Sequence, residues 1–406
     1  MSISKTLSIL ALCLLASCTQ QTPYWSQKER RIIESFQLDR LPEQTSPSNQ
    51  FAMNESAAHF GKQLFFDPRF SLGEKLSCAG CHRPERAFTD GLPKAKGILE
   101  TGRNTQSIIG SGYQNWFYWD GRKDSLWAQA LVPFEAADEM ASNRVQVLRI
   151  IGTDKHYRKQ YEHLFGTFPS IVLQASIPDH AGPWGDSDTR SNWYRIPQHA
   201  RHTLNKAYAH VGKSIAAYMR TLAIPETRLD RYIKTLASEG ESAANPLLSE
   251  EERRGLKLFI DPDKTHCLRC HNGPLFSNSD FHNIGTGTFE GKHLDFGRYL
   301  GIIALQQDEF NCLGNYSDAR PEDCKTLRFM QTNIHEEMKG AFKTPSLRNL
   351  NKTGPYFHDG RFASLKQVLQ HYLGPQTVDS EIPEISLTPE EQNAIIAFLG
   401  TLDAPE

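Results

Sequence analysis

The chain has 406 residues, and its 45 Lys and Arg nearly balance its 47 Asp and Glu, for a formal net charge of -2 at pH 7. A charge this close to neutral gives no electrostatic basis for binding nucleic acid or an anionic membrane surface, so no nucleic-acid partner is expected. The length is sufficient for two domains.

The N-terminus has the features of a bacterial export signal. Lys5 precedes an apolar stretch, Leu7 to Leu15, that is too short to span a bilayer as a mature helix. The stretch ends in Leu-Ala-Ser-Cys, which is typical of a lipoprotein signal. We expect a signal peptide over residues 1–17, a lipid anchor on Cys18, and a location on the periplasmic side of the envelope. A plain signal peptide cleaved nearby is the alternative. Residues 18–48, rich in Gln, Ser and Pro, are expected to form a tether.

Two short runs carry the pattern Cys-x-x-Cys-His. They are Cys78, Cys81 and His82 in the first run, and Cys267, Cys270 and His271 in the second. This is the attachment pattern of a c-type haem, in which two cysteines bond the vinyl groups and the histidine ligates the iron. A zinc site would need the two Cys pairs close together, and a thioredoxin-like redox pair would not need the histidine. The sequence therefore predicts two covalently bound haems. Because c-type haems are attached outside the bacterial cytoplasm, the protein must be exported.

Cys312 and Cys324 remain once the haem and signal cysteines are assigned. In an oxidising compartment such a pair favours a disulfide, here closing the loop 313–323.

An internal repeat indicates two related haem domains. Gly61 to Pro68 precedes the first haem motif much as Gly255 to Pro262 precedes the second. Helical apolar spacing near 211–222 and capping boxes at Ser249 and Thr388 predict helices, whereas strand signals are few. We expect a mainly α fold of two cytochrome c-like domains related by duplication, over residues 49–245 and 246–406 with a linker near 237–248. The segment 178–198 is an unassigned insertion.

The order of the motifs resembles the bacterial di-haem cytochrome c peroxidase and MauG superfamily. The motifs that carry the resemblance are the two haem runs, Arg103-Asn104-Thr105, Trp119-Asp120-Gly121-Arg122, Phe342 to Asn349, and Pro355 to Gly360. The resemblance covers essentially the whole mature chain. It implies that the first haem activates hydrogen peroxide, that the second stores or passes electrons, and that a calcium ion lies between them.

The resemblance also assigns residues around the first haem. Gln129 and Glu139 match the pair that assists proton transfer on peroxide, and Trp119 matches the tryptophan that relays charge between the haems. No histidine occurs between Arg83 and Arg103, where the electron-activated peroxidases carry a capping histidine. We therefore expect the first haem, on His82, to be permanently five-coordinate, as in MauG.

The second haem, on His271, separates the branches of the superfamily. The peroxidases have a methionine ligand fourteen residues after the histidine that matches His358, and here that position is Tyr372. No methionine follows Met338, and MauG-type enzymes have a tyrosine at this position. We therefore expect Tyr372 to ligate the iron of the second haem. Two alternatives remain: Tyr372 is only a residue packed on a helix, or the neighbouring His371 is the ligand. By the same resemblance Asn104, Thr353 and Pro355 match the calcium ligands.

The loop between Cys312 and Cys324 resembles the corresponding loop of proteins in the MauG/MbnH-like branch. This implies a peroxide-dependent enzyme that oxidises Trp or Tyr on a partner protein by long-range electron transfer. One alternative is a cytochrome c peroxidase supplied with electrons by a small redox protein. Another is a non-catalytic di-haem electron-transfer cytochrome.

Overall fold

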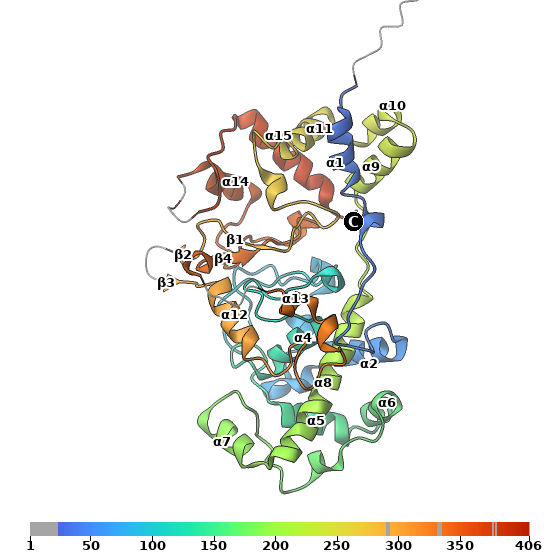
Figure 1. The fold of residues 1–406 in the computed structure, drawn as a ribbon, viewed down its shortest axis with the longest axis vertical. Helices are drawn as coiled ribbons and strands as arrows, with labels where there is room; N and C mark the ends of the chain where they lie inside the picture. Colours follow the sequence, from blue (N-terminus) through green and yellow to red (C-terminus); the bar gives the residue numbers. More distant parts are fainter. Residues whose placement is uncertain (1–22, 290–292, 331–334, 376, 378–379, 406) are drawn as a thin grey trace, which may run out of the picture.

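The computed structural model describes residues 23–289, 293–330, 335–375, 377 and 380–405. The expected signal peptide, 1–17, and Cys18 lie outside these residues. Helices dominate the described chain, and its four strands are two or three residues long, so the expected mainly α class is confirmed (Figure 1). None of the helices within the described ranges is long and apolar enough to span a membrane.

The first haem motif borders a hydrophobic core in the lower half of Figure 1. The long helix α8 runs through this half, and α2 and α4 pack along it. The helices of this half are α2 (Glu55–Phe66), α3 (Cys78–Cys81), α4 (Leu126–Glu135), α5 (Arg144–Thr153), α6 (Lys155–Phe165), α7 (Ser187–Arg195) and α8 (Gln198–Arg220). The segment 178–198 therefore contains α7, and Trp193 on this helix is buried in the same core.

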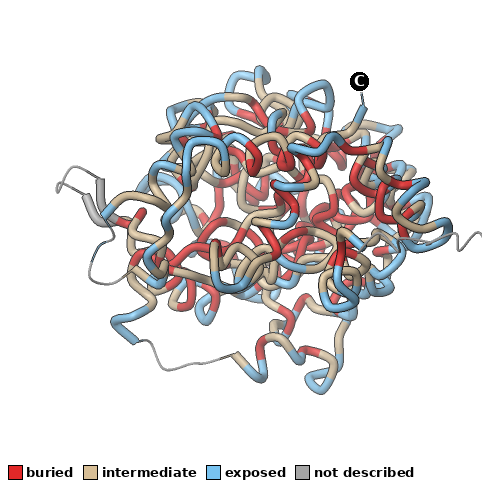
Figure 2. Tube along the Cα trace, turned by 90° about the horizontal axis from the view of Figure 1, so that it is seen from above, coloured by how far each residue is buried: buried red, intermediate tan, exposed pale blue. Residues whose placement is uncertain are grey.

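The second haem motif borders a separate core in the upper half of Figure 1. There α11 packs along α15, and α9 contacts α1. The helices of this half are α1 (Gln27–Glu34), α9 (Arg228–Ser238), α10 (Glu241–Ala244), α11 (Glu250–Phe259), α14 (Leu365–Leu373) and α15 (Pro389–Leu399). Figure 2 shows buried residues concentrated inside the molecule and exposed residues around its edge.

Two short sheets and a disulfide loop lie between the halves. Strand β1 (Phe281–Asn283) pairs antiparallel with β4 (Ala341–Lys343), and β2 (Thr288–Phe289) pairs with β3 (His293–Leu294). The helices α12 (Arg298–Gln306) and α13 (Lys325–Arg328) flank a loop closed by the Cys312–Cys324 disulfide, with an S–S distance of 2.04 Å. Tyr316 from this loop and Phe310, two residues before it, are buried in the first core, so a segment late in the chain packs on the first half.

The internal repeat also appears in how the helices pack. A Cβ on Gly61 of α2 would overlap the backbone carbonyl of Ser214 on α8, and a Cβ on Gly255 of α11 would overlap that of Ala394 on α15. Each glycine lets two helices approach more closely than any other residue would allow. The two halves therefore share one helix-pair contact built around equivalent glycines.

Packing divides the chain differently from the boundaries expected from sequence. Residues 27–34, expected within a tether, form α1, which starts with a capping box of Ser26 and Glu29. Trp25 and Ile33 are buried in the second core because their apolar side chains fit against α9. Helix α9 itself, which lies in the range 49–245, also packs in the second core. Composition alone does not reveal which core a short helix joins.

Candidate functional site

The first Cys-x-x-Cys-His motif forms the short helix α3, and His82 follows directly. The side chains of Cys78, Cys81 and His82 line one cavity. Nδ1 of His82 donates a hydrogen bond to the Phe88 carbonyl at 3.1 Å, because a carbonyl can only accept. Nε2 therefore keeps its lone pair for a metal. Burial lowers the pKa of His82, which favours the neutral imidazole that ligates iron.

The second motif repeats this construction. A 3-10 turn, Cys267–Arg269, precedes His271, whose Nδ1 donates to the Phe276 carbonyl at 2.9 Å. Burial lowers the pKa of His271 to about 4. In both motifs a carbonyl five or six residues downstream orients the imidazole, so each histidine presents Nε2 toward its own cavity.

The cysteines suit covalent haem attachment better than metal binding through thiolates. Burial raises the pKa of Cys78 to about 12 and that of Cys267 to about 11, so these thiols are protonated. Zinc requires thiolates, which are costly in such apolar surroundings. Across the described ranges, no group of three or more His, Cys, Asp and Glu could hold a metal ion.

The first cavity brings Gln129 and Glu139 together with His82. Gln129 is on α4, and Glu139 follows the end of that helix; apolar side chains such as Phe65 and Met219 complete the lining. Burial raises the pKa of Glu139 to about 7, although the Arg122 guanidinium acts in the opposite direction. A carboxyl group that titrates near neutral pH can both accept and return a proton in one reaction.

Sequence reasoning missed Pro133, which lines the first cavity from inside α4. The signal was present in the repeat: Pro133 follows Asp120 at the same distance as Tyr372 follows Asp359. The structure makes these segments equivalent, since Gly121 and Gly360 both have φ of +65°, and Ser125 and Ser364 both cap the next helix. Proline carries no side-chain donor atom, so α4 offers no iron ligand where α14 offers a phenol.

The second cavity has a volume of ≈ 560 Å³ and contains both His271 and Tyr372 in its lining. Tyr372 lies in the last turn of α14. Burial raises the pKa of its phenol, so the group is neutral in this apolar setting without a metal. The neighbouring His371 donates from Nε2 to the Ile284 carbonyl at 2.7 Å, which turns that nitrogen toward the backbone. Of the two residues considered from sequence, the structure brings Tyr372 to the cavity.

Trp119 lies at the wall of the second cavity and is 8% exposed. Its indole Nε1 donates to the Asn104 carbonyl at 3.0 Å, and its own carbonyl accepts from the Lys343 N–H at 2.7 Å. These bonds hold the ring between the motif of the first half and strand β4 of the second. Asn104, Thr353 and Pro355, the three residues matched to calcium, all line this cavity.

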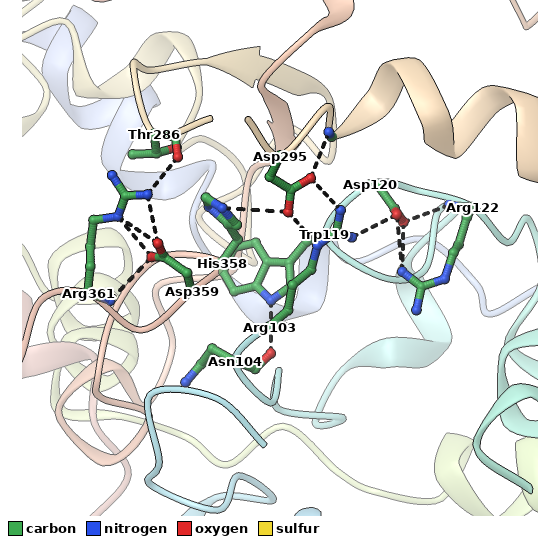
Figure 3. Close-up of polar contacts among 11 residues, drawn as sticks. Arg103, Asn104, Trp119, Asp120, Arg122, Thr286, Asp295, His358, Asp359 and Arg361 are labelled. Atoms are coloured by element: carbon green, nitrogen blue, oxygen red, sulfur yellow. Dashed lines mark hydrogen bonds and ion pairs between the residues drawn. The ribbon is translucent and has the colours of Figure 1, made fainter. Parts of the chain in front are cut away.

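An ionic network surrounds Trp119 and joins both halves (Figure 3). Arg103 binds Asp295 through two hydrogen bonds of 2.9 and 2.8 Å and binds Asp120 at 2.7 Å. His358 Nε2 lies 3.8 Å from Asp295, and its ring stacks on Phe342 with centroids 3.7 Å apart. Burial opposes the shift, but Arg122 and Arg103 lower the pKa of Asp120, and Arg103 lowers the pKa of Asp295.

Comparison with known proteins identifies the family. The family model for di-haem cytochrome c peroxidase matches residues 55–238. Cytochrome-c peroxidase IdrP1 of Denitromonas iodatirespirans is 30% identical over 420 residues, which cover 100% of this chain and 94% of the relative. The chain belongs to the di-haem cytochrome c peroxidase and MauG family. Its members are peroxide-using enzymes with two c-type haems, and the residues described above fit both haems.

Other members of the family carry different names. The methylamine utilization protein MauG of Methylorubrum extorquens is 29% identical over 371 residues, which cover 90% of this chain and 83% of the relative. The diheme peroxidase BthA of Burkholderia thailandensis has the same fold, with a TM-score of 0.62, 22% identity, and coverage of 89% of each chain. Since the two sequence relatives are about equally similar, identity alone does not assign this chain to a branch.

Proposed function

We propose that this enzyme is a MauG-like oxidoreductase that uses hydrogen peroxide to oxidise a Trp or Tyr side chain of a partner protein by long-range electron transfer. The observation that carries the proposal is Tyr372 in the cavity of His271, where the peroxidases have a methionine. A phenolate ligand stabilises oxidised iron, whereas a thioether raises the reduction potential and favours stored electrons. Tyr372 therefore favours an enzyme that holds oxidising equivalents for a distant substrate.

The chain's own residues supply proton transfer at the first site. The haem on His82, when bound, supplies the iron that reduces peroxide. Glu139, with its pKa of about 7, can accept the proton of bound peroxide and deliver it to the distal oxygen. Gln129 can orient peroxide by a hydrogen bond, and Pro133 leaves space for it because no ligand atom occupies that position.

Trp119 supports charge transfer between the two sites. Its indole is buried and fixed by a hydrogen bond to Asn104, and it lies at the wall of the second cavity. A protein substrate cannot enter the first cavity, which has a volume of only ≈ 50 Å³ and is lined mainly by apolar side chains. The substrate would instead bind outside the second half, near the loop between Cys312 and Cys324.

The second candidate is a cytochrome c peroxidase supplied by a small electron-donor protein. The 30% identity to IdrP1 over the whole chain favours it. A non-catalytic electron-transfer cytochrome is disfavoured, because the family consists of peroxide-using enzymes and the first cavity is lined by Glu139, whose pKa burial raises to about 7.

Three further parts of the proposal concern the setting of the enzyme. A calcium ion is held by Asn104, Thr353 and Pro355, whose side-chain and carbonyl oxygens suit a hard cation. The protein is periplasmic and anchored through lipid on Cys18. Each half is one haem domain, which agrees with the separate cores around His82 and His271.

The test incubates the purified enzyme and peroxide with the small exported protein encoded beside its gene. The proposal expects added oxygen on Trp or Tyr of that protein, detected by mass spectrometry and absent without peroxide. Rapid oxidation of reduced cytochrome c with no modified partner would instead establish the peroxidase function.

A further inference from the structure

Lys343 is a buried cation inside the second cavity. It is the last residue of β4, the residue is 3% exposed, and it belongs to the lining that also contains His271 and Tyr372. Its Nζ donates to the Gln114 side-chain oxygen at 2.9 Å. An uncharged amide satisfies one of the three donors of an ammonium group and supplies no counter-charge.

No carboxylate of the described chain forms an ion pair with Lys343, whereas Arg348 and Glu381 of the same lining each have a charged partner. Arg348 binds Asp230 at 2.8 Å, and Glu381 binds His282 at 2.8 Å. Burial alone lowers the pKa of Lys343 to about 8, with no neighbouring acid to oppose the shift. A buried ammonium without an anion is unfavourable, so a negatively charged group of a ligand bound in the cavity would stabilise it.

A haem brings two propionate carboxylates into its cavity. The second cavity must hold one haem, because Cys267 and Cys270 attach it there. We propose that Lys343 binds a propionate carboxylate of the haem on His271 and fixes the propionate edge of that haem beside Gln114 and Trp119. The inference rests on the haem complement of the family and is independent of the proposed substrate.

The backbone of Lys343 also links the proposed propionate contact to Trp119. Its N–H donates to the Trp119 carbonyl at 2.7 Å, so one residue touches both the cavity and the tryptophan backbone. Gln114 positions the ammonium from the first half of the chain. Lys343 is therefore a positioning residue that sets which edge of the second haem faces Trp119.

The test measures the reduction potentials of both haems in the haem-loaded protein by spectroelectrochemistry. Lys343→Met should leave the propionate uncompensated and favour ferric iron, because the added negative charge stabilises the more positive state. We expect the ferric-to-ferrous equilibrium of the haem on His271 to shift at least tenfold, about 59 mV for a one-electron couple. Lys339→Met is the matched control, since Lys339 carries the same charge but forms a surface pair with Glu336 and is outside the cavity lining.

Equal potentials in Lys343→Met and the wild type would overturn the inference, as would a shift confined to the haem on His82. A crystal structure of the haem-loaded wild type provides the second measurement and does not depend on the variant folding. It should place Nζ of Lys343 within ~3.2 Å of a propionate oxygen, the range of an N–H···O hydrogen bond. A propionate edge that points away from Lys343 in that structure contradicts the assignment.

Discussion

Burial raises the pKa of Glu139 to about 7, so the reaction it assists should depend on pH near neutrality. The carboxylate form accepts the peroxide proton, so the rate of the first haem with peroxide should rise as pH increases through about 7, the pKa that burial gives this group. Glu139→Gln cannot accept a proton and should slow the step by ~10² to 10⁴ while abolishing the pH dependence. Stopped-flow absorbance of the resting ferric protein measures both effects.

Asp138→Asn is the control for Glu139→Gln, because it removes a neighbouring carboxyl group that does not line the first cavity. It should retain the wild-type rate at high pH, and its pH midpoint should fall slightly, because the charge of Asp138 helps to raise the pKa of Glu139. A loss below tenfold in Glu139→Gln would reduce Glu139 to a structural role, and a requirement for prior reduction would indicate an electron-activated peroxidase.

Tyr372 and Tyr356 line the same cavity, which makes them a matched pair of hydroxyl groups. Tyr372→Phe removes the proposed phenol ligand and should change the electronic and magnetic-resonance spectra of the haem on His271. Tyr356 donates to the Leu350 carbonyl at 3.3 Å, so Tyr356→Phe should leave those spectra unchanged. Unaltered spectra in Tyr372→Phe would refute the ligand assignment, and the peroxide-oxidised state should decay faster in that variant if it is correct.

The helices α4 and α14 show how far the sequence could be used. The haem motifs could be predicted from the spacing of their own residues, and the position of Tyr372 is implied by its register with His358 in the family resemblance. Such spacing is informative because covalent attachment and ligation constrain neighbouring residues. Pro133 could have been found from the internal repeat, but only by comparing the two halves position by position.

Other features depend on contacts between distant segments, which local sequence patterns do not determine. The capping box of Ser26 and Glu29 marks α1, yet its packing on α9 is decided by the shape of the second core. Lys343 belongs to the motif from Phe342 to Asn349, but the motif does not reveal that the fold buries its side chain in the second cavity. Periodicity identifies helices but does not select their partners.

The close contact between α11 and α15 depends on Gly255. A methyl group on Gly255 would overlap the Ala394 carbonyl, so the helices would have to separate. Gly255→Ala should lower the free energy of unfolding by about 1–3 kcal/mol, the usual cost of overpacking. Denaturant unfolding of the haem-loaded protein measures the change. Gly102→Ala, where an added Cβ meets no atom within 4 Å, is the control and should stay within about 0.5 kcal/mol of the wild type.

Across the whole molecule, Arg103 connects the two halves through Asp120 and Asp295 (Figure 3). Both carboxyl groups have lowered pKa values in the folded protein, so their stabilising effect is present above the unfolded pKa of about 3.9 and is lost as pH falls further. Arg103→Gln should reduce the free energy of unfolding by about 3 kcal/mol at pH 7 and weaken its dependence on acid. Thermal unfolding from pH 7 to pH 3 tests this. Arg320→Gln breaks an exposed pair and should behave as the wild type.

A substitution at Trp119 should affect substrate oxidation without affecting peroxide reduction. The ring is fixed by Asn104 and lies beside the second cavity, and it is not among the residues that line the first. Trp119→Phe keeps an aromatic ring but is much harder to oxidise, so peroxide should still react at the first haem while partner oxidation is suppressed. Stopped-flow absorbance follows the first process, and mass spectrometry of the partner follows the second.

Trp116→Phe is the matched control for this experiment. Trp116 stacks against Arg298, 4.4 Å from its ring centroid, and a neighbouring cation disfavours removal of an electron from an indole. The control should therefore oxidise the partner at the wild-type rate. If both variants modify the partner equally fast, charge does not pass through Trp119; if only Trp119→Phe fails while its first haem still consumes peroxide, the buried indole is the connection between the two halves.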